Sequence, residues 1–523
     1  MNLRKRTYRI FTLLSLLAFG CTSSRTDDHY TGYVKQCLDL LMEYGTDRYG
    51  PEHTPLLVSI LDVETRTCPR DPLPLDESWR VIRRDRRNPA GSNLLHDNTL
   101  LRTMFHLSQL SGEGKYQDFA VDYLSYCMDN LVDEKGLFWW GWHRHYDVFT
   151  DSMTGHQGNH HEIHAIHCID WEQLWKVNPE AVEKEIQAIW QWHVIDKKTG
   201  EVNRHADGLP GCDFAMSSGA MMEAFSFLYM KTLNPLWLER AKLLSAYYWD
   251  RRNPDTDLFP ERPNAGSDRF DGSSFVTNIP GLYCHSLLKS YQMTGETAFR
   301  DQAAAILRAY ARFGFDEKTG RFWGALRLDG TPVTGPRPTD DYAQYEPRGH
   351  LDLWEPYAAG YQYAIYTAQA YAFAYQIFKE AIFLETAERF ASWIMQTPPG
   401  TPETVQTWYR EYSESFGQNG TYAGKYGRTI SFFLHLFILT SQGQYLDEAR
   451  KMADQAIEKL YHQGLFRGHP AKPYYEAVDG VGYLLYALLE LDLVSNNTQK
   501  VLADQAITVG KGNGKTLLAL DNW

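Results

Sequence analysis

Apolar residues recur at helical spacing along most of the chain, and the alternation typical of strands is sparse. One face of a helix predicted at 303–313 carries Ala303, Ile306, Leu307, Tyr310 and Phe313. The stretch 367–378 (TAQAYAFAYQIF) is instead apolar almost all round, as expected for a helix buried on every side. The pattern predicts an all-α protein that contains both amphipathic and fully buried helices.

A unit of helix, short turn, second helix and aromatic loop repeats along the chain. Four copies begin at Leu107, Phe227, Ser290 and Leu436, and weaker copies pass through 176–204 and 375–396. The turns recur roughly every 55–85 residues, near Gly112, Asn178, Asn234, Gly295, Lys379 and Gly443. Six such αα-hairpins closing on themselves give an inner ring of buried helices within an outer ring of amphipathic ones.

The hairpin count and the aromatic loops resemble the six-hairpin glycosidase superfamily over about residues 30–495. The resemblance implies an (α/α)6 barrel, a toroid that many glycoside hydrolases, some epimerases and several polysaccharide lyases share. It also implies that long aromatic loops at one mouth form the pocket. We expect a signal peptide at 1–21, a tether at 22–30, the catalytic barrel at 31–495 and a C-terminal tail at 496–523.

The N-terminus has the features of an export signal. Four basic residues among the first nine precede the apolar run 10–19, which is too short for a stable membrane span. The sequence Leu17-Ala18-Phe19-Gly20-Cys21 resembles a bacterial lipoprotein signal, in which Cys21 becomes lipidated. We expect an exported protein held by this lipid on the outer or cytoplasmic membrane. A simple secretory signal is the alternative.

Composition excludes some partners. The chain has 523 residues, 43% hydrophobic and 22% charged, with a net charge of −13 and no compensating basic stripe, which argues against nucleic acid. Aromatic residues make up 14% of the chain, a bias often seen in carbohydrate-handling proteins. Six cysteines follow Cys21 without a C-x-x-C pair, so neither a zinc knuckle nor a dense disulfide framework is indicated.

The segment 139–175 concentrates the chemistry. It reads WWGWHRHYDVFTDSMTGHQGNHHEIHAIHCIDWEQLW and combines Trp, His, Asp, Glu and Arg144. Aromatic faces stack on sugar rings, while polar groups bind hydroxyls and move protons. We interpret the segment as part of a sugar site; the alternative is a structured loop whose His and Trp brace the fold.

Carboxylates are the first catalytic candidates, because glycosidases need one protonated and one ionised carboxyl group. Glu162 lies in NHHEIH, Asp147 lies in HRHYDVF, and Asp213 precedes a predicted inner helix at 214–227. Asp213 is also a reasonable N-cap for that helix.

Histidines suggest a second chemistry. Some toroidal polysaccharide lyases use an Asn–His pair with a Tyr, and Asn159-His160 is similar to that pair, with Tyr146 as the phenol. The resemblance implies that His160 takes the C5 proton of a uronate. Elimination also needs cations to stabilise the enolate, and Arg144, Arg348 and Arg428 are available.

We predict neither a metal nor another cofactor. His160, His164 and His167 would share one helix face, but Glu162 and His164 lack the H-E-x-x-H spacing of zinc proteases. Chelation is therefore expected to leave most activity intact.

Arginine and histidine beside glycine favour an anionic sugar, since guanidinium groups bind carboxylates bidentately. Ordinary ion pairing with the acidic residues is the alternative for these cations. The predicted substrate-binding residues are Trp142, Arg144, Asn159, His161, His164, His205, Arg348, His350, Arg428, His469 and Tyr475.

The function expected from the sequence is degradation of uronate-containing saccharides by an exported glycoside hydrolase of glucuronidase-like type. A polysaccharide lyase that acts by β-elimination is the second hypothesis. A glycan-binding lipoprotein without catalysis is the third.

Overall fold

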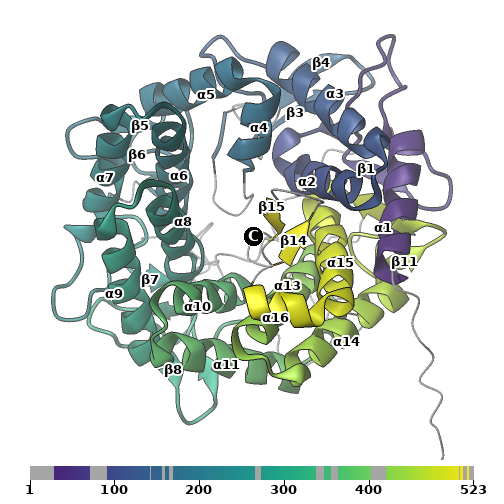
Figure 1. The fold of residues 1–523 in the computed structure, drawn as a ribbon. Helices are drawn as coiled ribbons and strands as arrows, with labels where there is room; N and C mark the ends of the chain where they lie inside the picture. Colours follow the sequence, from purple (N-terminus) through teal and green to yellow (C-terminus); the bar gives the residue numbers. More distant parts are fainter. Residues whose placement is uncertain are drawn as a thin grey trace, which may run out of the picture.

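Antiparallel helix pairs follow one another around a ring, with buried helices inside and amphipathic helices outside (Figure 1). The computed structural model describes residues 29–70, 91–141, 143–155, 160–163, 169–264, 272–336, 347–354, 363–401, 420–505, 507–509 and 515–517. This arrangement confirms the predicted all-α toroid of αα-hairpins.

The six predicted hairpins are present. Their inner helices are α2 (Leu94–Ser111), α4 (Trp171–Val177), α6 (Ala215–Thr232), α8 (Cys284–Thr294), α10 (Ala364–Phe378) and α13 (Ala423–Thr440). Their outer helices are α3 (Gly114–Asn130), α5 (Pro179–Trp192), α7 (Pro235–Trp249), α9 (Thr297–Phe313), α11 (Ala381–Gln396) and α14 (Gly443–Leu460). A further inner helix, α15 (Val481–Asn496), packs between α13 and α2, and α1 (His29–Leu40) covers it. The ring is therefore closed by the two ends of the chain.

The short turns within the hairpins lie where the sequence predicts them. Gly112 ends α2 in the left-handed conformation at a φ of 75°, which glycine adopts without strain. Asn178 and Asn234 cap α5 and α7, and a proline follows each of them in the first helical turn. The hairpins are thus encoded by local capping residues.

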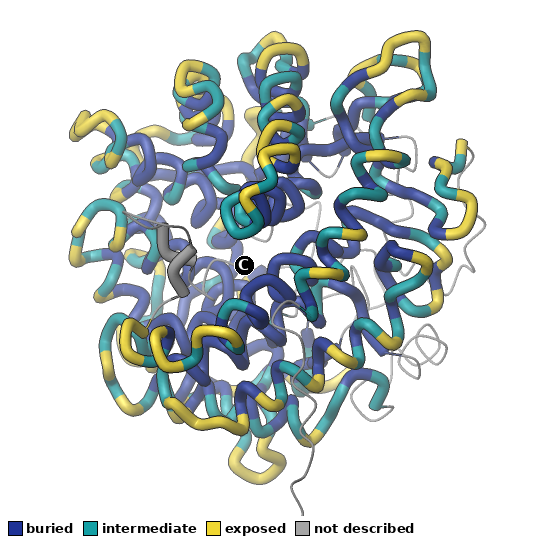
Figure 2. Tube along the Cα trace, turned by 45° about the vertical axis from the view of Figure 1, so that its right-hand side comes forward, coloured by how far each residue is buried: buried dark blue, intermediate teal, exposed yellow. Residues whose placement is uncertain are grey.

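Burial separates the two rings (Figure 2). Every residue of α10 from Ala364 to Ala374 is buried, whereas α9 buries one face that includes Ile306, Leu307 and Tyr310. One continuous apolar core joins the helices of both rings. The predicted contrast between 303–313 and 367–378 is confirmed.

The long connections from each outer helix to the next inner helix lie at one mouth, because every hairpin runs in the same sense. They contain short antiparallel pairs: β2 (Gly91–Ser92) with β3 (Arg144–Asp147) and β4 (Ser152–Gly155), β5 (Val194–Asp196) with β6 (Glu201–Val202), β7 (Phe275–Val276) with β10 (Ala325–Leu326), β8 (Phe315–Asp316) with β9 (Arg321–Phe322), β11 (Tyr461–His462) with β12 (Leu465–Phe466), and β1 (Ile60–Asp62) with β13 (Tyr474–Glu476). These pairs hold the loops that carry the candidate site.

The predicted tail contains helix α16 (Thr498–Asp504) and the antiparallel pair β14 (Ile507–Val509) and β15 (Lys515–Leu517). Strand β14 packs against α15 and α2, near the centre of the ring in Figure 1. Within the described residues, no helix is both long and apolar enough to cross a membrane.

Candidate active site

A buried carboxylate–imidazole pair lies in the loops that follow α3 and α5. Glu162 and His205 pair across an isolated antiparallel bridge, and Glu162 Oε1 lies 2.6 Å from His205 Nε2. The Glu162 side chain is fully buried, and His205 is nearly so. Because an isolated buried carboxylate is costly, the imidazole is an essential partner of this group.

Two further side chains approach the same carboxylate. Arg204 Nε lies 3.7 Å from Glu162 Oε1 and 3.2 Å from His205 Nε2, while His143 Nε2 lies 3.8 Å from Glu162 Oε2. Arg204 is 1% exposed, and its Nη2 has no hydrogen-bond partner among the described residues. We call Glu162, His205, Arg204 and His143 the Glu162 cluster. It combines one carboxyl group with a guanidinium, one buried donor of which has no partner among the described residues.

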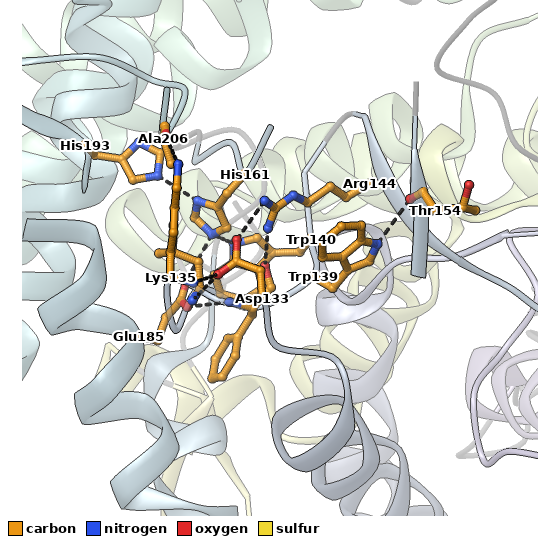
Figure 3. A network of polar contacts seen from close by, with 12 residues as sticks. Asp133, Lys135, Trp139, Trp140, Arg144, Thr154, His161, Glu185, His193 and Ala206 are labelled. Atoms are coloured by element: carbon orange, nitrogen blue, oxygen red, sulfur yellow. Dashed lines mark hydrogen bonds and ion pairs between the residues drawn. The ribbon is translucent and has the colours of Figure 1, made fainter. Parts of the chain in front are cut away.

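A network of polar contacts around His161, the residue before Glu162, fixes the loop that carries Glu162 (Figure 3). His161 Nε2 lies 3.0 Å from Glu185 Oε1, and His161 Nδ1 lies 2.7 Å from His193 Nε2. The Trp140 indole N–H donates to His161. Burial raises the pKa of the Glu185 carboxyl group well above its usual value and lowers the pKa of His161 well below its own. The pair is therefore a neutral hydrogen-bonded contact that anchors the neighbouring Glu162.

An ion pair holds the earlier part of the same connection, between α3 and Glu162. Arg144 Nη2 lies 2.8 Å from Asp133 Oδ2, and the guanidinium stacks 4.3 Å from the Trp139 ring centroid. Burial lowers the pKa of Arg144, and Asp133 opposes this shift. Figure 3 shows this pair beside His161, with Lys135 reaching across to the Ala206 carbonyl oxygen at 2.5 Å. Arg144 thus braces the connection between α3 and α4 rather than projecting alone into a pocket.

The Phe214 ring connects the Glu162 cluster to a second acidic group. The guanidinium carbons of Arg204 and Arg262 lie 4.8 Å and 5.0 Å from its centroid. Beyond Arg262, the fully buried Glu261 accepts a hydrogen bond from Asn278. Burial raises the pKa of Glu261 to about 7, and Arg262 opposes the shift. Two arginines are therefore held on one ring between two buried carboxyl groups.

Asp213 belongs to the same region. Its Oδ2 accepts hydrogen bonds from the Tyr247 hydroxyl and the Asn264 backbone N–H, both at 2.7 Å. Burial raises its pKa, while the Tyr247 hydrogen bond is the largest opposing influence. No side-chain cap hydrogen bond forms at the start of α6, so Asp213 is not the N-cap considered from the sequence; the cap position is Phe214.

Two predicted catalytic residues have local structural contacts. Asp147 Oδ1 accepts backbone hydrogen bonds from Phe149 and Thr150 in the turn between β3 and β4. Tyr146 is buried on β3, with its ring edge-on to Tyr126. No contact of either residue with the Glu162 cluster is seen among the described residues.

His160 is the most accessible imidazole near the cluster. It is half-buried, and its ring centroid lies 5.5 Å from that of His205. Residues 160–163 are extended and not helical, since Glu162 forms a bridge with His205. The assumption that His160 and the following histidines share a helix face is therefore wrong for this part of the segment. The predictions at Cys21, Trp142, Asn159, His164 and His167 lie outside the described residues.

The remaining predicted binding residues occupy other loops. His350 stacks on Trp323 and pairs with Asp316 at 2.9 Å, with Arg348 two residues before it. Arg428 is buried between the rings of Tyr366 and Tyr483. His469 and Tyr475 are also buried. Their roles in binding stay predictions.

The Glu162 cluster contains side chains of types that can bind a metal ion. Two imidazoles and one carboxylate suit a divalent transition metal, yet the 2.6 Å separation of Glu162 and His205 is that of a direct hydrogen bond. Across the described part of the chain, no group of three or more His, Cys, Asp or Glu side chains is arranged to hold a metal ion. The expected resistance to chelation stays a prediction.

Sequence reasoning missed His143, Arg204, Glu261 and Arg262. His143 and Arg204 lie 61 positions apart, and no spacing motif links them. One signal was available: Arg204 directly precedes His205 in a loop that already carried a predicted binding residue.

Comparisons with known proteins bear on this region of the chain. A family described as periplasmic pectate lyase matches residues 72–257, which include the whole Glu162 cluster. The pectate disaccharide-lyase of Dickeya dadantii (strain 3937) is 28% identical over 183 residues, which is 34% of this chain and 31% of that protein. The match therefore spans about a third of the relative's length.

Solved structures are also similar in shape. An unsaturated glucuronyl hydrolase specific for heparin aligns with a TM-score of 0.47 and 12% identity, covering 90% of this chain and 98% of that one. A GH76 α-mannanase of Bacteroides thetaiotaomicron aligns with a TM-score of 0.47 and 13% identity, covering 91% and 97%.

Proposed function

We propose that this protein is an exported enzyme that cleaves uronate-containing glycans by β-elimination at the Glu162 cluster. The observation that carries the proposal is a buried carboxylate–imidazole pair beside a guanidinium, one donor of which has no partner in the described part of the chain. These residues lie within 72–257, the part of the chain that matches the periplasmic pectate lyase family. The sequence alone favoured hydrolysis, and the make-up of the cluster moves our preference to elimination.

The proposed reaction uses the cluster as base and cation. Glu162 accepts a hydrogen bond from the Nε2–H of His205, and in this tautomer Nδ1 is the nitrogen with a lone pair. That nitrogen takes the proton from C5 of the uronate; the C–H electrons form the C4–C5 double bond, and the bond from C4 to the glycosidic oxygen breaks. The leaving oxygen takes a proton from water, and the His205 imidazolium returns its proton to the solvent. Asp207 Oδ2, 3.9 Å from Nδ1, stabilises the imidazolium that forms.

Arg204 supplies the positive charge that this reaction needs. Removal of the C5 proton places negative charge on the uronate carboxylate, and a fixed guanidinium in a water-poor site stabilises it strongly. Nη2 of Arg204, which is buried and has no hydrogen-bond partner among the described residues, is the donor that we assign to this contact. Arg262, buried on the same phenylalanine ring, places a second guanidinium in this region.

Hydrolysis is the second candidate, and one observation favours it. Glu261 has a pKa raised to about 7, so a large fraction is protonated near neutral pH, as a general acid requires. Asp213 is a second carboxyl group in the same region. Glu261 lies outside residues 72–257, the part of the chain that matches the periplasmic pectate lyase family, and for this reason we rank the hydrolase second.

We also propose that the mature protein is anchored through Cys21. The support is the N-terminal sequence itself, together with the match to a family described as periplasmic pectate lyase.

Digestion of a panel of uronate glycans, followed by ultraviolet absorbance and reducing-end assays, tests the reaction type. Elimination gives reducing ends together with the absorbance of a conjugated double bond, and hydrolysis gives reducing ends alone. Retention of glycan without either signal would support the non-catalytic hypothesis. If activity is lost with EDTA and restored by one divalent metal, His143, Glu162 and His205 become the ligands to substitute.

A further inference from the structure

A groove on the outer wall of the ring carries aromatic and basic side chains that the proposed reaction does not use. It lies between the outer helices α5 and α7, at the upper left of Figure 1, and has a volume of about 630 Å³. No residue of the Glu162 cluster lines it. The groove is therefore a separate feature of the surface.

Arg240 is the central cation of this groove. Its guanidinium carbon lies 4.4 Å from the Trp190 ring centroid and 4.3 Å from that of Trp237, so two indoles fix its position. Its Nε has no hydrogen-bond partner among the described residues. Burial lowers the pKa of Arg240, and no carboxylate of the described chain counteracts this. Nε itself is buried, but the Arg240 side chain as a whole is partly exposed. In a protein with a net charge of −13, an arginine fixed without an acidic partner among the described residues is available to an external anion.

Trp192 provides an apolar surface beside this cation. It is 38% exposed, which is unusual for a large aromatic side chain in this protein. Lys135 Nζ lies 4.9 Å from its ring centroid and adds a second positive charge. An exposed indole next to two cations suits a sugar ring that bears a carboxylate, because the ring stacks while the carboxylate pairs.

The other charges in the groove do not cancel this positive character. Lys184 pairs with the exposed Glu180 at 2.7 Å, and Glu183 accepts a hydrogen bond from Gln187 at 3.0 Å. Both acidic residues lie on α5, and neither contacts Arg240.

We propose that this groove is a second binding site for acidic glycan, separate from the catalytic cluster, that holds a polymeric uronate chain on the outer wall. It rests on the proposed function only in the choice of a uronate polymer as its ligand. The site raises the local concentration of polymer and has no effect on the cleavage of short substrates.

Affinity electrophoresis through a gel containing polygalacturonate tests the proposal, with Glu162→Gln as the background so that the polymer is not cut. Trp192→Ala and Arg240→Lys are expected to weaken retardation about tenfold, since each removes a stacking or bidentate contact. Matched controls are Met153→Ala, a similarly exposed apolar residue, and Arg251→Lys, at an arginine whose guanidinium stacks on Tyr247 outside the groove. Trp192 is exposed, so its substitution tests the groove without a risk to folding.

Kinetics give an independent readout. In the otherwise wild-type protein, Trp192→Ala is expected to raise KM for polygalacturonate severalfold and to leave kcat on a short uronate oligosaccharide unchanged. Unchanged retardation in both groove variants, or equal retardation by a neutral polymer, would overturn the proposal. If groove-dependent retardation is found but no uronate glycan is cleaved, the groove stands and the proposed function fails.

Discussion

Glu162 and His205 lie on two loops 43 positions apart, and their side chains meet at 2.6 Å across a single antiparallel bridge. The bridge fixes the backbone of both residues, so the contact does not depend on flexible side chains alone. His161, next to Glu162, is in turn held by Glu185 and His193. The geometry of the pair is therefore set by the fold, as the proposed catalytic role requires.

Glu162→Gln and His205→Ala are each expected to lower kcat/KM on a uronate glycan by about 100-fold or more, the usual contribution of a positioned proton acceptor. The double variant should be little worse than His205→Ala, because the two side chains act as one unit. Steady-state kinetics of the three variants measure this.

Asp316→Asn is the matched control, since Asp316 and His350 form another carboxylate–imidazole pair at 2.9 Å on a different loop. It should retain near wild-type activity. Additive losses at Glu162 and His205 would contradict a shared role, and near wild-type rates in correctly folded variants would make the pair structural.

Arg204→Lys keeps the charge and removes the planar fork that binds a carboxylate bidentately. We expect kcat/KM on a uronate glycan to fall by about tenfold or more, a loss of one charge-assisted hydrogen bond. Arg252→Lys, at an arginine that pairs with Asp257 away from the cluster, serves as the control. Equal effects of the two substitutions on kcat/KM would show that Arg204 has no specific role in the site.

Asp97 gives the protein a pH-dependent stability that is independent of catalysis. Burial raises its pKa from 3.8 to about 7, and the Tyr123 hydroxyl, which donates to Oδ2 at 2.7 Å, opposes the shift. The folded state thus binds the proton more tightly than the unfolded state, so its contribution is full below about pH 4 and is lost as pH rises towards 7.

Asp97→Asn removes this titration. The difference in unfolding free energy between Asp97→Asn and wild type should shift in favour of the variant by about 2 kcal/mol between pH 5 and pH 8. Urea unfolding at the two pH values measures it, and the exposed Asp255→Asn should show no such shift. A difference that is the same at both pH values would refute the assignment.

The fold was predictable because its signals are local. Gly112, Asn178 and Asn234 terminate or cap helices through their own backbone preferences, and a buried helix such as 364–378 differs from its neighbours in composition alone. The closure of the ring by α15 and α1 was harder to predict, because it depends on contacts between the two ends of the chain.

The candidate site was only partly predictable. Glu162, His205 and Asp213 stood out because polar residues in aromatic loops are unusual, but their partners depend on how separate loops converge. Arg204 approaches Glu162 only because the bridge places the two loops side by side. His161 looked like a ligand contact from the sequence, yet it is fully buried against Glu185.

Cys21→Ser is expected to move the mature protein from the membrane fraction to the soluble fraction, because the substitution removes the residue that would be acylated. Fractionation with detection of the protein by antibody measures this. Ser23→Ala, two positions later, should stay with the membrane. A wild-type protein that is already soluble would contradict the lipoprotein assignment.

Cleavage of polygalacturonate in isotopically labelled water tests the central claim most directly. Elimination breaks the bond without adding water, so mass spectrometry should find products with an unsaturated end and no heavy oxygen from the cleavage step. The products with an unsaturated end should be absent with His205→Ala and should still form with Asp316→Asn. Saturated products in which the new reducing end carries one heavy oxygen and the other new end carries none, with unchanged yield in His205→Ala, would contradict β-elimination at the Glu162 cluster and direct attention to Glu261 and Asp213.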